Sequence, residues 1–146
     1  MSGFLAGVRE RASALGFRLA FPESADERTL EAVRALARDR IARPILLVDP
    51  ARPDTHGAAR ALEAAGVEVR DPREEALRTA TLTDLLAARA HKGLTREKAL
   101  ELAVLPIYCA DAMVRRGEAQ GCVAGAAHTT ADVLRAALWL VGPAPG

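Results

Sequence analysis

The stretch RPILLVDP, from Arg43 to Pro50, places four consecutive aliphatic residues between a basic start and an Asp-Pro turn. Successive side chains of a strand point to opposite faces, so an unbroken apolar run predicts a strand that is buried on both sides. Such strands are typical of a parallel sheet that is covered by helices. The stretch therefore predicts an α/β fold with this strand inside the sheet.

The sequence before this strand alternates between helical and strand-like segments. Ser24 is expected to begin a helix, because Glu27 three residues later completes a capping box. The expected elements are a helix over Gly3–Leu15 that ends at Gly16, a strand within 17–24 that ends at Pro22, and a helix that carries Leu30, Val33 and Ala37.

The alternation continues after the strand, and capping residues and glycines mark most of the boundaries. Asp54, Asp71 and Thr95 are the expected caps, and Gly66, Gly93 and Gly117 the expected stops. The expected elements are a helix over Thr55–Ala65, a strand within 66–72, a helix from there to about Ala90, helices after Thr95 and Pro106, a strand over 121–125 and a helix over Ala131–Val141. This alternation predicts a parallel sheet between helical layers.

Composition places the chain among soluble globular proteins. Of its 146 residues 50% are hydrophobic and 27% are charged, and the formal net charge of +1 gives no general attraction to nucleic acid or an anionic membrane. No apolar run approaches the roughly 18 residues of a membrane span, and the charged N-terminus does not read as a signal peptide. We expect a cytoplasmic protein with one α/β domain over residues 1–146, no nucleic-acid or membrane partner, and reduced thiols at Cys109 and Cys122.

The stretch GCVAGAAHTTADVLRAAL, from Gly121 to Leu138, places polar residues where an expected strand meets the last helix. Thr129 is placed to cap that helix. The N–H groups of the first turn, together with His128, Thr130 and Arg135, form a candidate anion site. Open α/β sheets bind ligands at such strand ends. Spacing alone favours a structural interpretation, in which Thr129 only caps and Arg135 pairs with Asp132.

Two further segments carry clustered charges. The segment RAHKG places Arg89, His91 and Lys92 at the end of one helix, where they form a candidate cationic wall for a phosphate-bearing ligand. Basic side chains favour that end of any helix, so spacing again favours a structural role. The acidic residues of FPESADER, from Phe21 to Arg28, are explained by the expected capping box without a ligand.

Several classes of site are not visible in the sequence. The three histidines, His56, His91 and His128, are far apart and form no metal-binding pair. No glycine-rich nucleotide loop and no serine–histidine–aspartate system is apparent. We therefore expect no metal site.

Taken together, these segments resemble the N-terminal half of the phosphate acetyltransferases. AFPESADERTLEAVRALA resembles that family's first strand and helix, and IARPILLVDP resembles its second strand. RAHKGLTREKA is similar to its basic segment, and RRGEAQGCVAGAAHTTADVLRAAL is similar to its motif of glycine, two small residues, histidine and two hydroxyl residues that continues to Asp-x-Leu-Arg. One departure is Ala136, where the family usually has proline.

The resemblance implies a three-layer α/β/α sandwich with a mainly parallel sheet, of the isocitrate/isopropylmalate dehydrogenase-like type. It implies transfer of an acetyl group between coenzyme A and phosphate, so acetyl-CoA and acetyl phosphate are substrates and no cofactor is bound. Arg89 and Arg135 match arginines that bind and stabilise the anionic substrates. The candidate substrate-binding residues are His128, Thr129, Thr130, His91 and Lys92.

The resemblance also implies a partner for this chain. The family's chain is roughly twice as long, and the missing C-terminal half holds the proposed base and a serine–arginine pair. The complete enzyme is expected to be a homo-oligomer, and this chain alone an inactive half. Two alternatives stay open: a free-standing module that binds an anion or acyl phosphate without catalysis, and the phosphotransacetylase-like domain of a malic enzyme relative.

Overall fold

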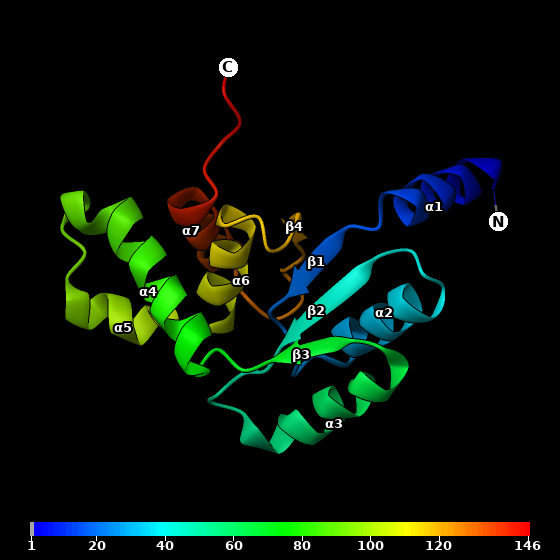
Figure 1. The fold of residues 1–146 in the computed structure, drawn as a ribbon, viewed down its shortest axis with the longest axis horizontal. Helices are drawn as coiled ribbons and strands as arrows, with labels where there is room; N and C mark the ends of the chain where they lie inside the picture. Colours follow the sequence, from blue (N-terminus) through cyan, green and yellow to red (C-terminus); the bar gives the residue numbers. More distant parts are fainter. Residues whose placement is uncertain (1) are drawn as a thin grey trace.

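The computed structural model describes residues 2–146 and contains a parallel sheet in the order β3-β2-β1-β4 (Figure 1). In register, Ala20 of β1 lies opposite Ile45 of β2 and Cys122 of β4. Within the described residues the strands are β1 (Arg18–Phe21), β2 (Arg43–Leu47), β3 (Glu68–Arg70) and β4 (Gly121–Cys122). The parallel α/β arrangement predicted from the 43–50 stretch is confirmed.

Alternate residues of β2 and of the segment that follows it enter two different cores. Leu46 and Val48 pack in one buried cluster with Val33 of α2 (Glu27–Arg38). Ile45 and Leu47 pack on the opposite face in another cluster. The α2 helix and the short α3 (His56–Arg60) therefore cover one face of the sheet, whereas α4 (Glu75–Arg89) and α6 (Pro106–Arg115) cover the other (Figure 1).

A third cluster joins four helices beyond the sheet. Leu85 of α4, Ala103 of α5 (Arg96–Ala103), Tyr108 of α6 and Leu140 of α7 (Thr130–Leu140) are buried together. This cluster fixes α7 against α4 and α6, so the position of α7 is set by packing as well as by its loop. No helix in residues 2–146 is long and apolar enough to cross a membrane.

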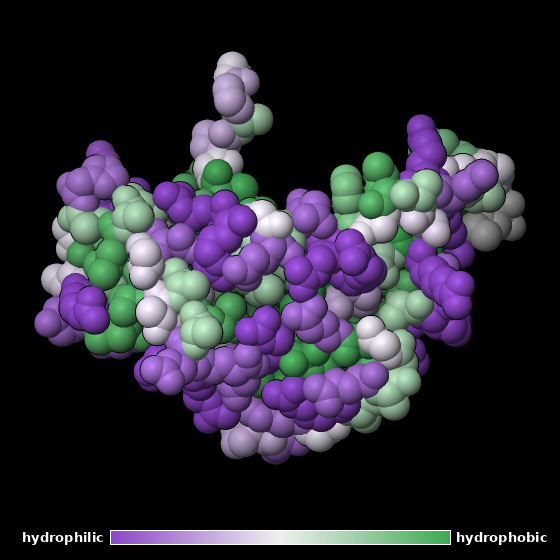
Figure 2. Space-filling model, in the orientation of Figure 1, coloured by the Kyte–Doolittle hydropathy of each residue, from purple (hydrophilic) through white to green (hydrophobic). Residues whose placement is uncertain are grey.

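The first helix, α1 (Gly3–Leu15), contributes no buried residue. It points away from the rest of the fold in Figure 1 and is attached by the Ser13 hydroxyl, which donates to the carbonyl oxygen of Arg40 at 2.8 Å. Phe4, Leu5 and Leu15 are more than half exposed. Figure 2 shows the resulting hydrophobic residues on the outer surface near this end of the molecule.

Several helix boundaries differ from those expected from the sequence. The capping box from Ser24 to Glu27 is wrong: Asp26 caps α2 by accepting the Arg28 N–H, and Ser24 is buried. The Asp26 N–H donates to the carbonyl oxygen of Glu23 at 3.1 Å, so the chain makes a further turn before the helix begins. Asp54 is not a cap either, because it pairs with Arg52.

Two expected elements are shorter or less regular than their patterns predict. The expected helix over 55–65 consists of α3 flanked by 3-10 turns at Pro53–Thr55 and Ala61–Ala65. The expected strand over 121–125 is reduced to two residues, because the chain turns away from β1 after the Val123 N–H donates to the carbonyl oxygen of Ala20. The Thr95 cap and the break at Pro106 are confirmed.

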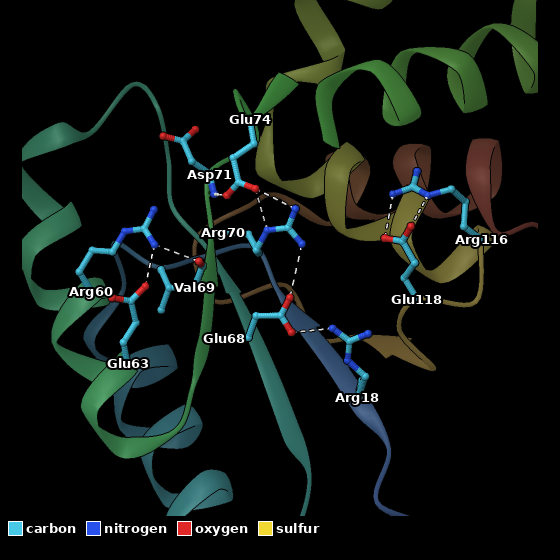
Figure 3. A network of polar contacts seen from close by, with 10 residues as sticks. All are labelled: Arg18, Arg60, Glu63, Glu68, Val69, Arg70, Asp71, Glu74, Arg116 and Glu118. Carbon is cyan, nitrogen blue, oxygen red and sulfur yellow. Dashed lines mark hydrogen bonds and ion pairs between the residues drawn. The ribbon is translucent and has the colours of Figure 1, made fainter. Parts of the chain in front are cut away.

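An ion-pair network covers part of the sheet surface (Figure 3). Glu68 of β3 pairs with Arg18 of β1 and with Arg70, and Arg70 also pairs with Glu74 at 2.8 Å just before α4. On the other side of β3, Arg60 donates to the carbonyl oxygen of Val69 at 3.0 Å. The network therefore links the edge strand β3 to β1, α3 and the start of α4.

Candidate functional site

The carboxyl ends of β1 and β4 lie side by side where the order of the sheet reverses. From β1 the chain proceeds to β2 and β3 on one side, whereas β4 pairs with the other side of β1. Ligands of open α/β sheets bind outside the strand ends at such a reversal. Two loops leave the sheet there, residues 22–26 between β1 and α2 and residues 123–129 between β4 and α7.

Glu23 joins these two loops through its side chain. Its Oε1 accepts the backbone N–H groups of Gly125 at 2.8 Å and Ala126 at 2.9 Å. Its Oε2 accepts those of Ala127 at 2.6 Å and His128 at 2.7 Å, and lies 3.0 Å from His128 Nδ1. Four consecutive backbone donors thus surround one buried carboxylate, which is 5% exposed.

These contacts determine the charge of Glu23. Burial opposes its ionisation, but the backbone N–H groups of His128, Ala127 and Ala126 and the His128 ring together lower the pKa of Glu23 to about 2. Hydrogen bonds of this kind favour the ionised form of a carboxyl group. Glu23 is therefore an anion held inside the 123–129 loop.

Arg28 provides a second link between the same loops. Its guanidinium donates to the carbonyl oxygen of Ala126 at 2.7 Å and pairs with Asp26 at 2.8 Å. Asp26 is also the N-cap of α2. The start of α2 and the approach to α7 are therefore held together by neighbouring side chains.

The sequence pattern did not identify Glu23 as part of the site. Glu23 directly follows the expected end of a strand, which is where ligand-site residues of such sheets lie. The capping-box interpretation assigned the acidic residues of this segment a structural role instead. The donors to its carboxylate begin 102 residues later in the chain. Only the pairing of β1 with β4 makes them neighbours, and that pairing is tertiary information.

Thr129 is the N-cap of α7 as expected from the sequence, and the helix begins at Thr130, one residue before the expected Ala131. The Thr129 hydroxyl accepts the Asp132 N–H at 3.2 Å, which confirms the cap. In the described chain the N–H groups of Thr130 and Ala131 have no hydrogen-bond acceptor. Together with the Thr129 N–H, which likewise has no acceptor in residues 2–146, these groups are open to an anion, whereas the loop donors are already bound by Glu23.

Arg135 lies one turn further along α7 and is half exposed. Its Nη1 is 3.3 Å from Asp132 Oδ1, which is the surface pair that the spacing predicts. Its charge also acts on Tyr108: burial raises the pKa of that phenol, and Arg135 opposes the rise. The Arg135 side chain therefore lies near the Tyr108 hydroxyl as well as near Asp132.

Arg89 reaches the same helix from α4. Its guanidinium carbon lies 4.7 Å from the centroid of the Trp139 ring, a cation–π distance. The Trp139 ring lies 6.0 Å from that of Tyr108. Because Arg135 and Trp139 are four residues apart on α7, they are neighbours on its surface. The structure thus brings the two candidate catalytic arginines to one helix.

His91 and Lys92 are placed differently. Both are exposed in a 3-10 turn, Ala90–Lys92, which follows α4. Neither side chain forms a hydrogen bond or ion pair with another residue of the described part of the chain, and neither lines the pocket at His128. They extend the basic character of this end of α4 without joining the Glu23–His128 corner.

A pocket of about 330 Å³ opens beside the Glu23–His128 pair. It lies between the 22–26 loop, the segment after β2 and the approach to α7. Its lining residues are Pro22, Glu23, Ser24, Ala25, Asp26, Asp49, Arg52, Ala127 and His128. Within residues 2–146 no group of three or more histidine, cysteine or acidic residues is arranged to hold a metal ion.

Comparison with known proteins gives a consistent result. A family model described as phosphate acetyl/butaryl transferase matches residues 3–146. The phosphate acetyltransferases of Thermoanaerobacterium thermosaccharolyticum and Paracoccus denitrificans are 36% and 38% identical over 139 residues, which cover 95% of this chain but 42% and 40% of those proteins. The solved structure of the EutD phosphotransacetylase from Staphylococcus aureus superimposes with a TM-score of 0.81 at 29% identity, over 97% of this chain and 43% of that one. The chain thus spans about two fifths of the length of these relatives.

Proposed function

Because the chain belongs to the phosphate acetyl/butaryl transferase family, we propose that it forms one wall of a site at which an acetyl group passes between coenzyme A and phosphate. The observation that carries the proposal is the position of the start of α7 at the carboxyl ends of β1 and β4. Glu23 holds the loop before α7 at the reversal of the sheet order, where open α/β sheets bind ligands. The open N–H groups at the start of α7 follow directly after that loop, and Arg135 lies one turn further along the same helix.

The groups at this corner suit a phosphate or an acyl phosphate. The N–H groups of Thr130 and Ala131 lie at the positive end of a helix, and His128 and the threonine hydroxyls add donors. Arg135 is half exposed, so its guanidinium can exchange Asp132 for a phosphate oxygen. Arg89 of α4 adds a second permanent positive charge beside Trp139 of α7. His91 and Lys92, which follow α4, extend the basic surface.

The reaction that we propose needs little more from this wall than charge and position. The thiolate sulfur of coenzyme A attacks the carbonyl carbon of acetyl phosphate, and the bond between that carbon and the phosphate oxygen breaks. Phosphate leaves with the electron pair of that bond, and the arginines stabilise its negative charge. The thiol proton passes to a base, which the family resemblance places in the part of the longer relatives that this chain does not match.

We therefore expect this chain alone to show no acetyl transfer above background. A positioned base typically contributes about 10²–10⁴-fold, and an open half-site admits water that weakens its electrostatic interactions. The test measures release of acetyl-CoA from acetyl phosphate and coenzyme A. It uses this chain alone, and then this chain mixed with the unmatched portion of a related phosphate acetyltransferase.

Acetyl-CoA formation only in the mixture supports the proposal that this chain forms one wall of the site. Coenzyme A-dependent turnover by this chain alone overturns it. The corner geometry also supports a second candidate, a binding module without catalysis, because the open donors and Arg135 lie on this chain. Phosphate binding without turnover in either arrangement supports that module instead.

A further inference from the structure

The Glu23–His128 contact fixes more than the path of a loop. An ionised carboxylate has only acceptors, so a ring nitrogen 3.0 Å from Oε2 of Glu23 must be the donor. Glu23 accepts four backbone N–H groups, and these hydrogen bonds keep it ionised although it is buried. The hydrogen of the His128 ring therefore belongs on Nδ1, and Nε2 is left for another partner.

The surroundings leave Nε2 without a partner in the described chain. Among residues 2–146 the ring of His128 hydrogen-bonds with Glu23 alone, and its side chain is 28% exposed beside the 330 Å³ pocket. The other charged side chains that line this pocket already form ion pairs or hydrogen bonds with neighbouring residues. Asp26 pairs with Arg28, Arg52 pairs with Asp54, and Asp49 accepts the N–H of Ala51.

We propose that Glu23 is a positioning residue of this site: its carboxylate fixes the hydrogen of the His128 ring on Nδ1 and leaves Nε2 at the pocket as the ring atom that meets the phosphate-bearing substrate. The proposal rests on the proposed function for the identity of that substrate. The geometry of the ring does not depend on it. A carboxylate behind a histidine orients the ring, selects its tautomer and stabilises a proton on the opposite nitrogen.

The chain offers a matched control for this proposal. Glu27 stands four residues after Glu23, is exposed, and has no hydrogen bond or ion pair with another described residue. E27Q therefore makes the same chemical change in the same segment without touching His128. E23Q removes the charge and presents an amide, which cannot accept the loop N–H groups on both of its terminal atoms.

The experiment is nitrogen-15 NMR of the histidine rings at about pH 9, where free imidazole is neutral. Loss of signals in H128Q assigns the His128 ring among the three histidines of the chain. We expect the hydrogen on Nδ1 in the unmodified chain and in E27Q, and loss of that preference in E23Q. Circular dichroism and the amide signals of β2 verify that E23Q is folded.

A hydrogen on Nε2 in the unmodified chain overturns the proposal, and this measurement decides even where E23Q fails to fold. An unchanged ring spectrum in folded E23Q also overturns it. Titration with inorganic phosphate then separates this proposal from the proposed function. If phosphate shifts the amide signals of Thr130 and Ala131 but not the nitrogen-15 signal of His128 Nε2, the proposed contact between the ring and the substrate is wrong. A titration that moves neither contradicts the proposed function and leaves the tautomer result standing.

Discussion

Glu23 and Asp111 are both buried carboxylates, but their surroundings shift their pKa values in opposite directions. Glu23 accepts four backbone N–H groups, and its pKa falls to about 2 despite burial. Asp111 is 4% exposed, and its Oδ2 has no hydrogen-bond partner in the described chain. Burial therefore raises the pKa of Asp111 to about 6, although the neighbouring thiol of Cys122 opposes the rise.

Asp111 should make the protein less stable as the pH rises. Because its folded-state pKa of about 6 exceeds its ordinary value of 3.8, the folded state favours the protonated form. The contribution of Asp111 to the free energy of unfolding should therefore be highest below about pH 4 and fall up to about pH 6. Asp111→Asn should remove this fall and raise the free energy of unfolding above pH 6 by on the order of 1–3 kcal/mol.

Urea unfolding from about pH 2 to about pH 8 measures this difference. Glu23→Gln is the comparison of opposite sign, because a carboxyl with a lowered pKa stabilises the fold above its ordinary value of 4.5 and loses that effect as the pH falls toward 2. A wild-type stability that rises from pH 4 to pH 6, with no gain in Asp111→Asn, would contradict the assignment.

Substitution of Arg135 tests whether Asp132 or a bound phosphate is the main partner of its side chain. Its ion pair with Asp132 joins two half-exposed side chains, and such pairs contribute at most about 1 kcal/mol. We expect Arg135→Ala to weaken phosphate binding while the melting temperature stays nearly constant. Arg135→Lys should recover binding only in part, because a single ammonium replaces a planar fork of donors.

NMR titration with phosphate and thermal melts measure the two effects side by side. Arg34→Ala is the control, because Arg34 is exposed on α2 and has no ion pair with another described residue. A lower melting temperature with unchanged phosphate binding would make Arg135 a structural residue.

At the scale of single elements, α7 depends on both its cap and its core contacts. Thr129 satisfies the Asp132 N–H, and Ala136 and Leu140 are buried against α4 and α6. A cap contributes to the helix locally, whereas the buried residues fix its position. The cap can therefore be removed without displacing the helix.

Thr129→Ala should lower the free energy of unfolding by about 1 kcal/mol, because one N–H of the first turn loses its acceptor. Thr129→Ser should cost much less, since serine caps equally well. Thr95→Ala removes the corresponding bond to the Lys98 N–H in α5 and serves as the reference for a cap away from the site. Urea unfolding of the three variants measures these costs, and equal stability of Thr129→Ala and wild type would show that the cap is dispensable.

At the scale of the whole molecule, two regions of residues 2–146 expose several large hydrophobic side chains. One is α1, which has no buried residue. The other is a groove of about 320 Å³ beside the edge strand β4, where Leu134, Leu138 and Val141 of the α7 region line the wall and are about half exposed. The longer relatives have further polypeptide that this chain does not match.

The groove beside β4 should drive self-association of this chain at high concentration, because an exposed apolar patch next to a sheet edge favours pairing. Leu138→Glu should reduce the association measured by light scattering on dilution. Leu100→Glu is the matched control, because Leu100 is 41% exposed on α5, away from the groove. A monomer at all concentrations, or an equal effect of both substitutions, would contradict this prediction.

Local patterns in the sequence predicted the order and type of most elements. The aliphatic run after Arg43 required a strand buried on both faces, and Thr95, Pro106 and Thr129 marked helix starts that the structure confirms. These signals are local, because a strand's alternation or a helix's cap depends on residues within a few positions. The resemblance to phosphate acetyltransferases also rested on contiguous motifs, and the family comparison confirms it.

Tertiary structure alone decided the anchor of the site. Ser24 and Glu27 fit a capping box by spacing, but Glu23 is drawn to the N–H groups of residues 125–128, so the helix starts later. Arg89 likewise meets α7 only because Trp139 lies beneath it. Such contacts join residues far apart in the chain. They form only when β1 pairs with β4 and α4 packs on α7, because burial and strand pairing, rather than local spacing, set the distances between those residues.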